Sequence, residues 1–349
     1  MAIEVGSATR RDLSARTVSV KDVAAAAGVS LGTVSNVLNR PEKVSPTTLS
    51  HVLAVIDQLG FVRNDAARQL RAGTNRSVGM VVLDVRNPFF TDVAQGVEAC
   101  LGRHRRPLIL GNSGQDEARE STYLDLFEEQ RVSGLLITPV GRVLPRLRRI
   151  RDRGTAVVIV DRRVGSREFS SVSVDDQRGG RLAAQHLVDG GRRRIAFVGG
   201  PRGLNQVKER LAAAEKVVAA APGVSLRFHE TATMDAGAGR HAAEHLLALG
   251  AAERPDAIFA ANDLIALGVL QALTLAGIRV PHDVAIVGYD DIDFAASAAI
   301  PITSVRQPRV QLGTVAAELL LDTIAQPDTS RLRHVVLEPE LVVRRSTTG

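Results

Sequence analysis

Apolar residues recur at helical spacing twice within the run TVSVKDVAAAAGVSLGTVSNVLN, from Thr17 to Asn39. Each set predicts a short amphipathic helix. The apolar positions are Val20, Val23, Ala24 and Ala27 in the first set and Val34, Val37 and Leu38 in the second. Ser19 and Ser30 are suitable N-caps, and Gly28 can end the first helix because glycine tolerates a left-handed backbone.

The other face of the predicted second helix carries mostly small or polar side chains. They are Leu31, Gly32, Thr33, Ser35, Asn36 and Asn39. A short helix, a turn with glycine and a second helix with an exposed polar face are typical of the helix-turn-helix, which places its second helix in the DNA major groove. The alternative is an ordinary antiparallel helix pair.

A third helix is predicted to begin at Ser45-Pro46 and to end at Gly60. Its apolar stripe is Leu49, Val52, Leu53, Ile56 and Leu59, which we expect to complete a small three-helix core. Asn64 can then cap a helix of about seven residues, 65–71. So short a helix is unstable alone in water, so it must pack on something or fold when a partner binds.

From Ser77 onward, apolar strands alternate with amphipathic helices. Expected strands are Val78–Leu83, Pro107–Leu110, Gly134–Thr138, Ala156–Val160, Ser171–Val174, Ile195–Val198, Ala257–Ala260, Val284–Val287 and Ile302–Val305. This alternation predicts parallel sheets covered on both faces, and its length favours two lobes. The expected domains are a disordered leader 1–16, a headpiece 17–62, a hinge and linker 63–76 and an α/β core 77–349. Ligands of such folds bind at the carboxyl ends of strands.

Positive charge is concentrated near the start of the chain. The 349 residues carry a formal charge of +6, and residues 1–76 hold ten basic and six acidic side chains, a net +4. This concentration indicates a polyanionic partner, although a charged run is also what an ordinary solvated surface looks like.

Several classes of protein are disfavoured by composition. Cys100 is the single cysteine, which excludes intrachain disulfides and cysteine-based zinc sites. No apolar run approaches the roughly 18 residues of a membrane span, and the first residues lack the apolar core of a signal peptide. We therefore expect a cytoplasmic protein.

The run VSVKDVAAAAGVSLGTVSNVLNRPEKVSPTTLSHVLAVIDQLGFVRNDAARQLRAG resembles the DNA-binding module of the lactose-repressor (LacI/GalR) family. The remainder is similar to that family's core, which resembles periplasmic sugar-binding proteins. Its landmarks, in order, are VRNPFF, SVSVDDQRGG, RRIAFVGGP, AANDLIALG, VAIVGYDDID, TSVRQP and LEPELVVRRST. The resemblance implies two Rossmann-like lobes, an N-lobe of about 77–161 plus 292–325 and a C-lobe of about 162–291 plus 326–345.

The resemblance also implies a homodimer whose two headpieces read pseudo-palindromic operator DNA. Paired hinge helices would enter the minor groove, with Leu70 wedged between central base pairs; the alternative for Leu70 is packing on its own headpiece. Leu31, Gly32, Ser35 and Asn36 would face base edges, and an asparagine can pair with adenine. The expected DNA-contacting set is completed by Ser19, Thr33, Asn39, Asn64, Ala67 and Arg68.

For a small-molecule effector bound between the lobes, the resemblance points to Asn87, Phe89, Asp161, Gln206, Arg210, Asn262 and Asp290. Each residue has a simpler alternative role: Asn262 and Asp290 as helix caps, Arg210 as a surface cation, Phe89 as core. The chain departs from the family where Leu204 and Gln206 replace small hydroxyl residues and where Thr233–Ala236 lacks an aromatic side chain. The effector is expected to be a carbohydrate or related metabolite, and the alternative is a non-sugar or lost effector.

Two other classes of protein, an enzyme and a sugar-binding transport component, share some of these features. For an enzyme, GxxxxGK[ST] and GxSxG are absent, and the GxGxxA string at Gly237–Ala242 does not follow a convincing strand. The string His241-Ala-Ala-Glu-His245 matches the HxxEH of zinc peptidases. We favour a solvated helix face instead, because the string is short and no third ligand is evident. No cofactor or metal is therefore expected, and the chain is predicted not to be an enzyme.

A sugar-binding transport component is disfavoured by the basic headpiece. No heptad-repeat tail follows the last predicted strand, so we expect a dimer. The sequence therefore predicts a DNA-binding transcriptional regulator, a repressor, whose operator affinity changes when a small molecule binds between two lobes.

Overall fold

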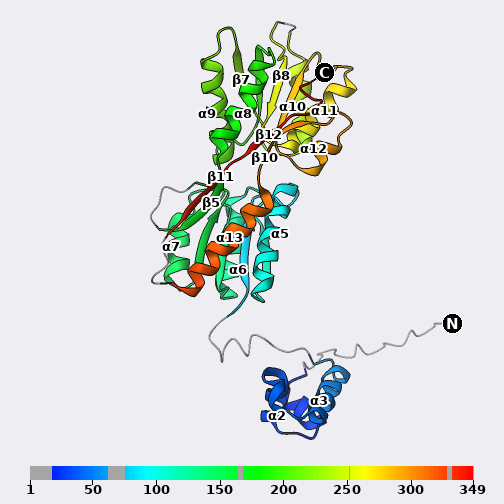
Figure 1. Cartoon of the computed structure of the whole chain (residues 1–349), viewed down its shortest axis with the longest axis vertical. Helices are drawn as coiled ribbons and strands as arrows, with labels where there is room; N and C mark the ends of the chain where they lie inside the picture. The colour runs from blue at the N-terminus through cyan, green and yellow to red at the C-terminus, as the bar shows by residue number, and fades with distance from the viewer. Residues whose placement is uncertain (1–17, 62–74, 164–167, 251, 328–331, 349) are drawn as a thin grey trace, which may run out of the picture. The chain divides into compact units, whose positions relative to one another are not determined.

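The computed structural model describes residues 18–61, 75–163, 168–250, 252–327 and 332–348 (Figure 1). Two compact units are present, residues 1–73 and residues 74–349. The expected hinge residues Asn64, Ala67, Arg68 and Leu70 lie outside the described residues.

The first unit is helical: α1 (Val20–Ala26), α2 (Leu31–Asn39), the 3-10 turn η1 (Pro41–Lys43) and α3 (Pro46–Gln58). The predicted caps are confirmed, because Ser19, Ser30 and Ser45 each accept a backbone N–H of the first turn. Gly28 follows α1 with a φ of +63°, which requires glycine's freedom. The three helices enclose a small apolar core: Val23, Ala24, Ala27, Val34, Val37, Val52, Val55 and Phe61.

For one residue of α3, the prediction that it belongs to the core was wrong. Leu53 is 47% exposed, whereas Val55 is buried beside Val52. The inward face of α3 therefore runs through Val52, Val55, Ile56 and Leu59, at the i, i+3, i+4, i+7 spacing of one helix side, and Leu53 lies beyond its edge.

The second unit contains two six-stranded sheets. The first has the order β11-β5-β4-β3-β1-β2 and the second β12-β10-β9-β8-β6-β7, and all pairings are parallel except β10 with β12. The first sheet consists of β1 (Val78–Val82), β2 (Leu108–Asn112), β3 (Gly134–Ile137), β4 (Ala156–Val160), β5 (Ser170–Val174) and β11 (His334–Leu337). The second consists of β6 (Arg194–Gly199), β7 (Ser225–Glu230), β8 (Ala257–Ala260), β9 (Ala285–Asp290), β10 (Thr303–Arg306) and β12 (Glu340–Val342).

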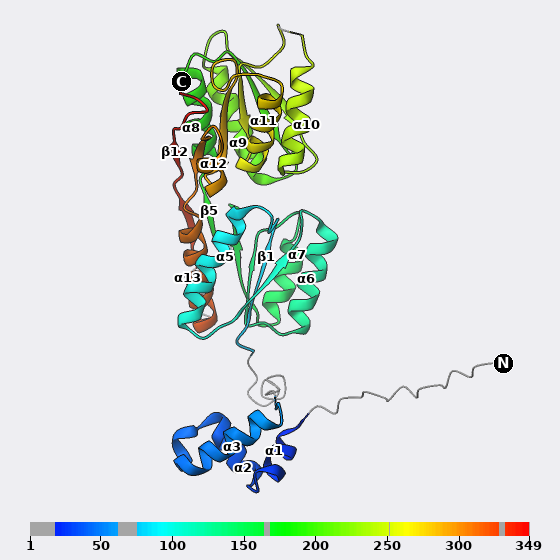
Figure 2. The same cartoon turned by 90° about the vertical axis from the view of Figure 1, so that its right-hand side faces the viewer.

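Helices cover both faces of the first sheet, and each sheet with its helices forms a lobe (Figures 1 and 2). In the first lobe, Val78, Met80 and Val82 of β1 pack toward α5 (Pro88–Arg103) and α13 (Arg309–Ala325). Val81 packs toward α6 (Glu117–Glu129) and α7 (Leu144–Asp152). The helices of the second lobe are α8 (Asp176–Asp189), α9 (Asn205–Ala219), α10 (Ala236–Leu247), α11 (Asp263–Leu275) and α12 (Asp293–Ser297).

The two-lobed parallel α/β class is therefore as predicted, but the expected lobe boundaries are not. The chain crosses between lobes after β5, after β10 and after β11, each one strand later than expected. The expected breaks near residues 161, 291 and 325 assign the residues of β5 and β11 to the second lobe and those of β10 to the first. In the structure these assignments are reversed. These strands are short apolar runs, and such a run does not specify which sheet it joins. The structure also adds β7, β11 and β12, which were not expected as strands.

Close helix packing in both lobes depends on glycine. A Cβ atom at Gly96 of α5 would lie 2.1 Å from the carbonyl oxygen of Val310, at the start of α13. In α10, a Cβ at Gly239 would lie 2.2 Å from the Ile265 oxygen, so the GxGxxA string forms a helix contact. No helix in the described parts of the chain is long and apolar enough to cross a membrane.

Gly96→Ala should lower the free energy of unfolding by about 1–3 kcal/mol, because the added methyl group must displace the α13 backbone. Gly102→Ala, in the same helix, is the matched control: its Cβ meets nothing within 4 Å. That control should be neutral or stabilising by up to about 1 kcal/mol. Urea unfolding monitored by circular dichroism measures both, and equal effects would contradict the packing account.

Candidate functional site

The exposed face of α2 carries most of the residues that the sequence predicts to contact DNA. Leu31 is 48% exposed, while Val34 and Val37 are buried beneath it. Two of the predicted DNA-contacting side chains already have local partners: the Thr33 hydroxyl bonds Ser30 Oγ at 3.0 Å, and Asn39 Nδ2 donates to the Ser35 carbonyl at 2.8 Å. These bonds hold both ends of the helix.

Asn36 differs from these neighbours. It is exposed, and its side-chain amide makes no hydrogen bond to any described residue. Gly32 leaves open space beside it, since a Cβ there would meet only Ser30 Oγ, at 3.6 Å. Ser19 is less available, because its hydroxyl donates to Asp22 Oδ2 at 2.7 Å in a capping box. An unpaired amide on an exposed helix face can bond a base edge.

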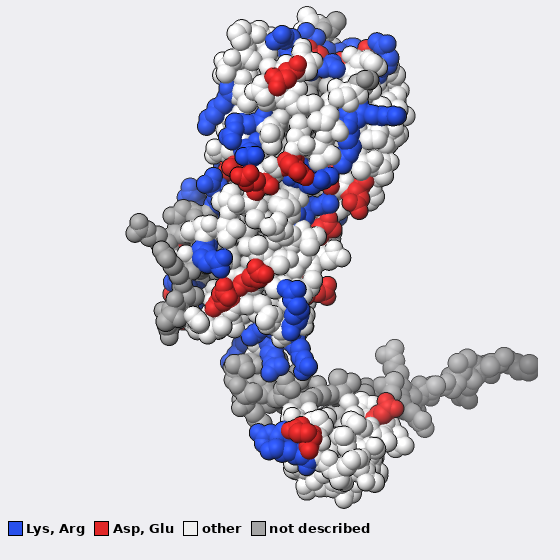
Figure 3. Space-filling model, in the orientation of Figure 1, with Lys and Arg blue, Asp and Glu red and all other residues white. Residues whose placement is uncertain are grey.

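In the described part of the first unit, basic and acidic side chains are equal in number. Residues 18–61 hold three basic and three acidic side chains: Lys21, Arg40 and Lys43, with Asp22, Glu42 and Asp57. The face drawn in Figure 3 is accordingly mostly uncharged over these helices. Of the net +4 in residues 1–76, +3 belongs to residues 62–76, which contain four arginines and one aspartate. The excess positive charge that indicated a polyanionic partner therefore lies mostly in residues 62–76.

In the second unit, all seven residues expected to bind an effector line one cavity between the lobes. They are Asn87, Phe89, Asp161, Gln206, Arg210, Asn262 and Asp290. All seven are buried, and the cavity they enclose has a volume of about 40 Å³. This is room for little more than a water molecule. We call it the interlobe cavity.

Asp290 joins the two lobes within the interlobe cavity. Asn87, the N-cap of α5 in the first lobe, donates from Nδ2 to Asp290 Oδ2 at 2.9 Å. Gln307, in the crossing between β10 and α13, donates to Asp290 Oδ1 at 2.7 Å. Burial raises the pKa of Asp290, and the Arg210 guanidinium 4.0 Å away opposes that rise. The buried carboxylate is thus held by both lobes and by one crossing.

Arg210 is a buried cation, so its alternative role as a surface residue is wrong. Its side chain is 3% exposed, its Nε donates to Asp176 Oδ1 at 2.7 Å, and Nη1 donates to the Ala261 carbonyl at 2.7 Å. The guanidinium carbon lies 3.5 Å from the centre of the Tyr289 ring. Stacking and charge pairing together stabilise the cation without water.

Asp161 is the least compensated carboxylate in the cavity. Its Oδ2 accepts from Gln206 Nε2 at 2.7 Å, but its buried Oδ1 has no hydrogen-bond partner among the described residues. Burial, with the nearby charge of Asp176, raises the pKa of Asp161 to about 8. An unpartnered carboxyl oxygen beside a cavity is what a ligand hydroxyl satisfies, since a hydroxyl can both donate and accept.

Two of the residues that line the cavity also have the alternative structural role predicted for them. Asn262 caps α11 by accepting the Ile265 N–H at 2.9 Å, and Phe89 packs edge-on against Phe90 within the core. Asp290 lies at the end of β9 and is not a cap. The sequence did not indicate Gln307 and Gln115, which also line the cavity. Gln307 lies in the quoted TSVRQP motif, so that motif was the available signal.

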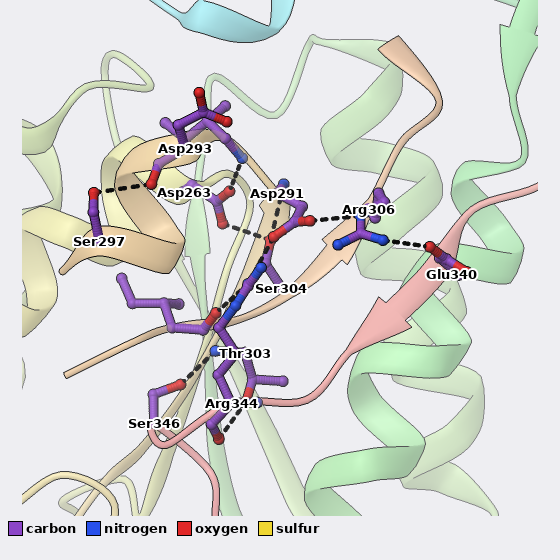
Figure 4. A network of polar contacts seen from close by, with 12 residues as sticks. Asp263, Asp291, Asp293, Ser297, Thr303, Ser304, Arg306, Glu340, Arg344 and Ser346 are labelled. Atoms are coloured by element: carbon purple, nitrogen blue, oxygen red, sulfur yellow. Dashed lines mark hydrogen bonds and ion pairs between the residues drawn. The ribbon is translucent and has the colours of Figure 1, made fainter. Parts of the chain in front are cut away.

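A second network fixes the turn that presents Asp290 (Figure 4). Asp290 and Asp291 have φ angles of +103° and +53°, uncommon for residues with side chains. Ser304 Oγ accepts the Asp291 N–H at 3.1 Å and donates to buried Asp263 at 2.6 Å. The Asp291 carboxylate pairs with Arg306 at 2.7 Å and with Arg344 at 2.6 Å. The network therefore holds a strained turn.

The histidines of the HxxEH string are not arranged as a metal site. His241 Nδ1 lies 2.8 Å from the Gly237 carbonyl of its own helix, while the His245 ring lies 5.8 Å from the His229 ring of β7. Among the described residues no group of three or more His, Cys, Asp or Glu side chains is placed to hold a metal ion.

Comparison with known proteins gives two family matches. Residues 19–64 match the model for bacterial regulatory proteins of the lacI family, and residues 164–347 match a periplasmic binding protein-like domain. The chain is 33% identical to the HTH-type transcriptional repressor PurR of Photobacterium profundum, over 94% of this chain and 98% of the relative.

Two solved structures are also similar. A transcriptional regulator CelR–cellobiose complex is 33% identical, with 94% of this chain and 99% of that chain covered and a TM-score of 0.69. A lac repressor dimer bound to operator and the anti-inducer ONPF is 26% identical, with 96% and 100% covered and a TM-score of 0.79.

Asp161→Asn should change how stability depends on pH. With a pKa near 8 when folded and near 4 when unfolded, Asp161 keeps its proton only in the folded protein between those values. Rising pH therefore lowers the free energy of unfolding in that window, by at most about 1.4 kcal/mol per pH unit. Asparagine carries no such proton, so the variant should gain stability relative to the natural chain from pH 5 to pH 8.

Thermal melts of both proteins across this range measure the difference. Asp152→Asn, at an exposed carboxylate, is the control and should run parallel to the natural chain. Parallel curves for Asp161→Asn would show that this carboxyl is ionised in the folded protein at neutral pH.

Proposed function

This chain belongs to the lacI family of bacterial regulatory proteins, and we propose that it is a homodimeric, cytoplasmic repressor controlled by a hydroxyl-rich effector bound in the interlobe cavity. As a member of this family it is a DNA-binding transcriptional regulator and not an enzyme. The finer assignments are the residues that read the operator, the chemistry of the effector and the route by which binding changes DNA affinity.

The observation that carries the proposal is the composition of the interlobe cavity. Seven buried side chains meet there from both lobes, and Asn87 and Asp290 bond to each other across the lobe boundary. A ligand that uses the same polar atoms competes with this bond, so its binding changes how the lobes are held together. Acceptors at Asp161 and Asp290 beside donors at Arg210 and Asn262 suit a molecule with several hydroxyl groups.

The similar structures support this effector class. One similar regulator is in complex with cellobiose. The cavity lining contains three aspartates, Asp84, Asp161 and Asp290, and one arginine, Arg210. Even with Asp161 protonated, the carboxylates outnumber the cation, so an anionic ligand would meet repulsion. We therefore favour a neutral carbohydrate over a sugar acid.

A dimer is supported by an exposed apolar strip on the first sheet. Ile109 and Leu110 lie on the edge strand β2 and are 38% and 40% exposed. An edge strand with apolar side chains is suited to burial against a second chain. The similar lac repressor structure is a dimer bound to operator. Two headpieces would then read two halves of a pseudo-palindrome, with residues 64–71 as the paired hinge segments.

Asn36→Ala should relax base preference at one position of each operator half-site. Loss of the exposed amide removes about 1–3 kcal/mol of discrimination there and leaves the other positions unchanged. Binding-site selection from a random DNA pool, performed with both proteins, measures this. Gln58→Ala, at an exposed position of α3, is the control. Identical preferred sequences for the Asn36 variant and the natural protein would show that Asn36 does not read a base.

The effector assignment is tested by operator binding. The operator recovered by selection is titrated with the full chain, alone and with ribose, glucose, cellobiose, maltose and their phosphate esters in turn. We expect a neutral sugar to change operator affinity by about tenfold, the size of a typical allosteric coupling. If operator affinity is unchanged with every sugar, the effector half of the proposal fails and the DNA-binding half stands.

A further inference from the structure

A second, larger cavity adjoins the interlobe cavity. It has a volume of about 630 Å³ and shares Gln115 and Leu204 with the interlobe cavity as a common wall. The first lobe contributes α6, α7 and the loop between β3 and α7, and the second lobe contributes residues 201–204. We call it the outer cavity. Its volume lies within the range of small-molecule sites, roughly 300–1,000 Å³.

Donors line part of the outer cavity. Most arginines between residues 142 and 153 form ion pairs with carboxylates: Arg146 with Asp125 and Glu128, Arg148 with Glu168, Arg151 with Asp152 and Arg153 with Glu128. Arg142 and Arg149 have no carboxylate partner among the described residues, and both line the outer cavity. The two guanidiniums left unpaired in this segment therefore face the same space.

Acceptors also line the outer cavity. Glu120 is 4% exposed, and its Oε2 accepts the Val140 N–H at 2.8 Å. Burial raises the pKa of Glu120. Gln115 Oε1 is buried and has no hydrogen-bond partner in the described parts of the chain. Two buried acceptors thus border the outer cavity, one of them in its wall with the interlobe cavity.

The charges in the outer cavity are balanced. Arg146 also lines the cavity, but its charge is paired with Asp125 and Glu128 outside the lining. Glu117 and Glu120 offset the remaining Arg142 and Arg149, and apolar side chains such as Leu124 and Leu204 complete the lining. A sugar ring has hydroxyl groups around its edge and apolar C–H faces, so it matches a site with charged hydrogen-bonding groups and apolar walls. A phosphate group would meet the carboxylates as well as the guanidiniums.

We infer that the outer cavity is a second sugar subsite and that the effector is a neutral carbohydrate of at least two units. One terminal unit occupies the interlobe cavity and the next unit occupies the outer cavity, passing Gln115 and Leu204. This inference rests on the proposed function, because it assigns the same effector a second contact region. It assigns Glu120 and Arg142 as residues that determine effector length.

Titration calorimetry with the full chain tests this. Glucose, cellobiose, cellotriose, maltose and glucose 6-phosphate are the probes. We expect a disaccharide to bind at least about tenfold more tightly than glucose, because its second unit adds hydrogen bonds to charged groups. Glu120→Gln and the exposed-site variant Arg142→Ala should each remove most of that gain and leave glucose binding unchanged. Glu244→Gln and Arg240→Ala, on exposed positions of α10, are the matched controls.

The outcomes separate the two proposals. If glucose changes operator affinity and a second unit adds nothing to binding, the subsite inference fails while the proposed function stands. Preferred binding of glucose 6-phosphate, or a disaccharide gain that survives both variants, also overturns the subsite. If no carbohydrate binds, the subsite and the effector assignment fail together.

Discussion

The buried carboxylate of Asp290 is the constraint on which the interlobe cavity depends. It accepts hydrogen bonds from Asn87 of the first lobe and from Gln307 of a crossing segment, and Arg210 of the second lobe lies 4.0 Å away. Removal of a charge from water is costly unless it is paired, so the lobes must stay close enough to supply these partners. The arrangement of the lobes is thereby linked to the chemistry of one side chain.

This link gives a physical basis for regulation. With only about 40 Å³ of space, the interlobe cavity cannot admit a sugar unless the polar pairs within it separate. A ligand supplies replacement partners for Asp290 and Asp161, and its differential affinity for the two arrangements sets how far the equilibrium moves. The network behind Asp290, built on Ser304 and Asp263, keeps the turn fixed while the partners of Asp290 change.

Much of this was predictable from sequence because local rules operate strongly in this chain. Ser19, Ser30 and Ser45 cap the three headpiece helices as their side chains require, and buried apolar runs form the central strands. Lobe membership was not predictable for β5, β10 and β11, because it depends on pairing between residues far apart in the sequence. Family resemblance identified Asp290. Its partner Gln307 was present only within the TSVRQP motif, because its contact with Asp290 depends on the geometry of the crossing segment.

The central claim is that the Asn87–Asp290 bond couples the cavity to operator binding. Asn87→Ser tests it most directly, because serine can still cap α5 but is too short to reach Asp290. Operator affinity is measured by titration with and without the sugar that binds best. We predict that the variant shifts affinity without sugar, in the direction that sugar shifts the natural protein, and that it responds weakly to added sugar. An unchanged affinity with an unchanged sugar response would contradict it.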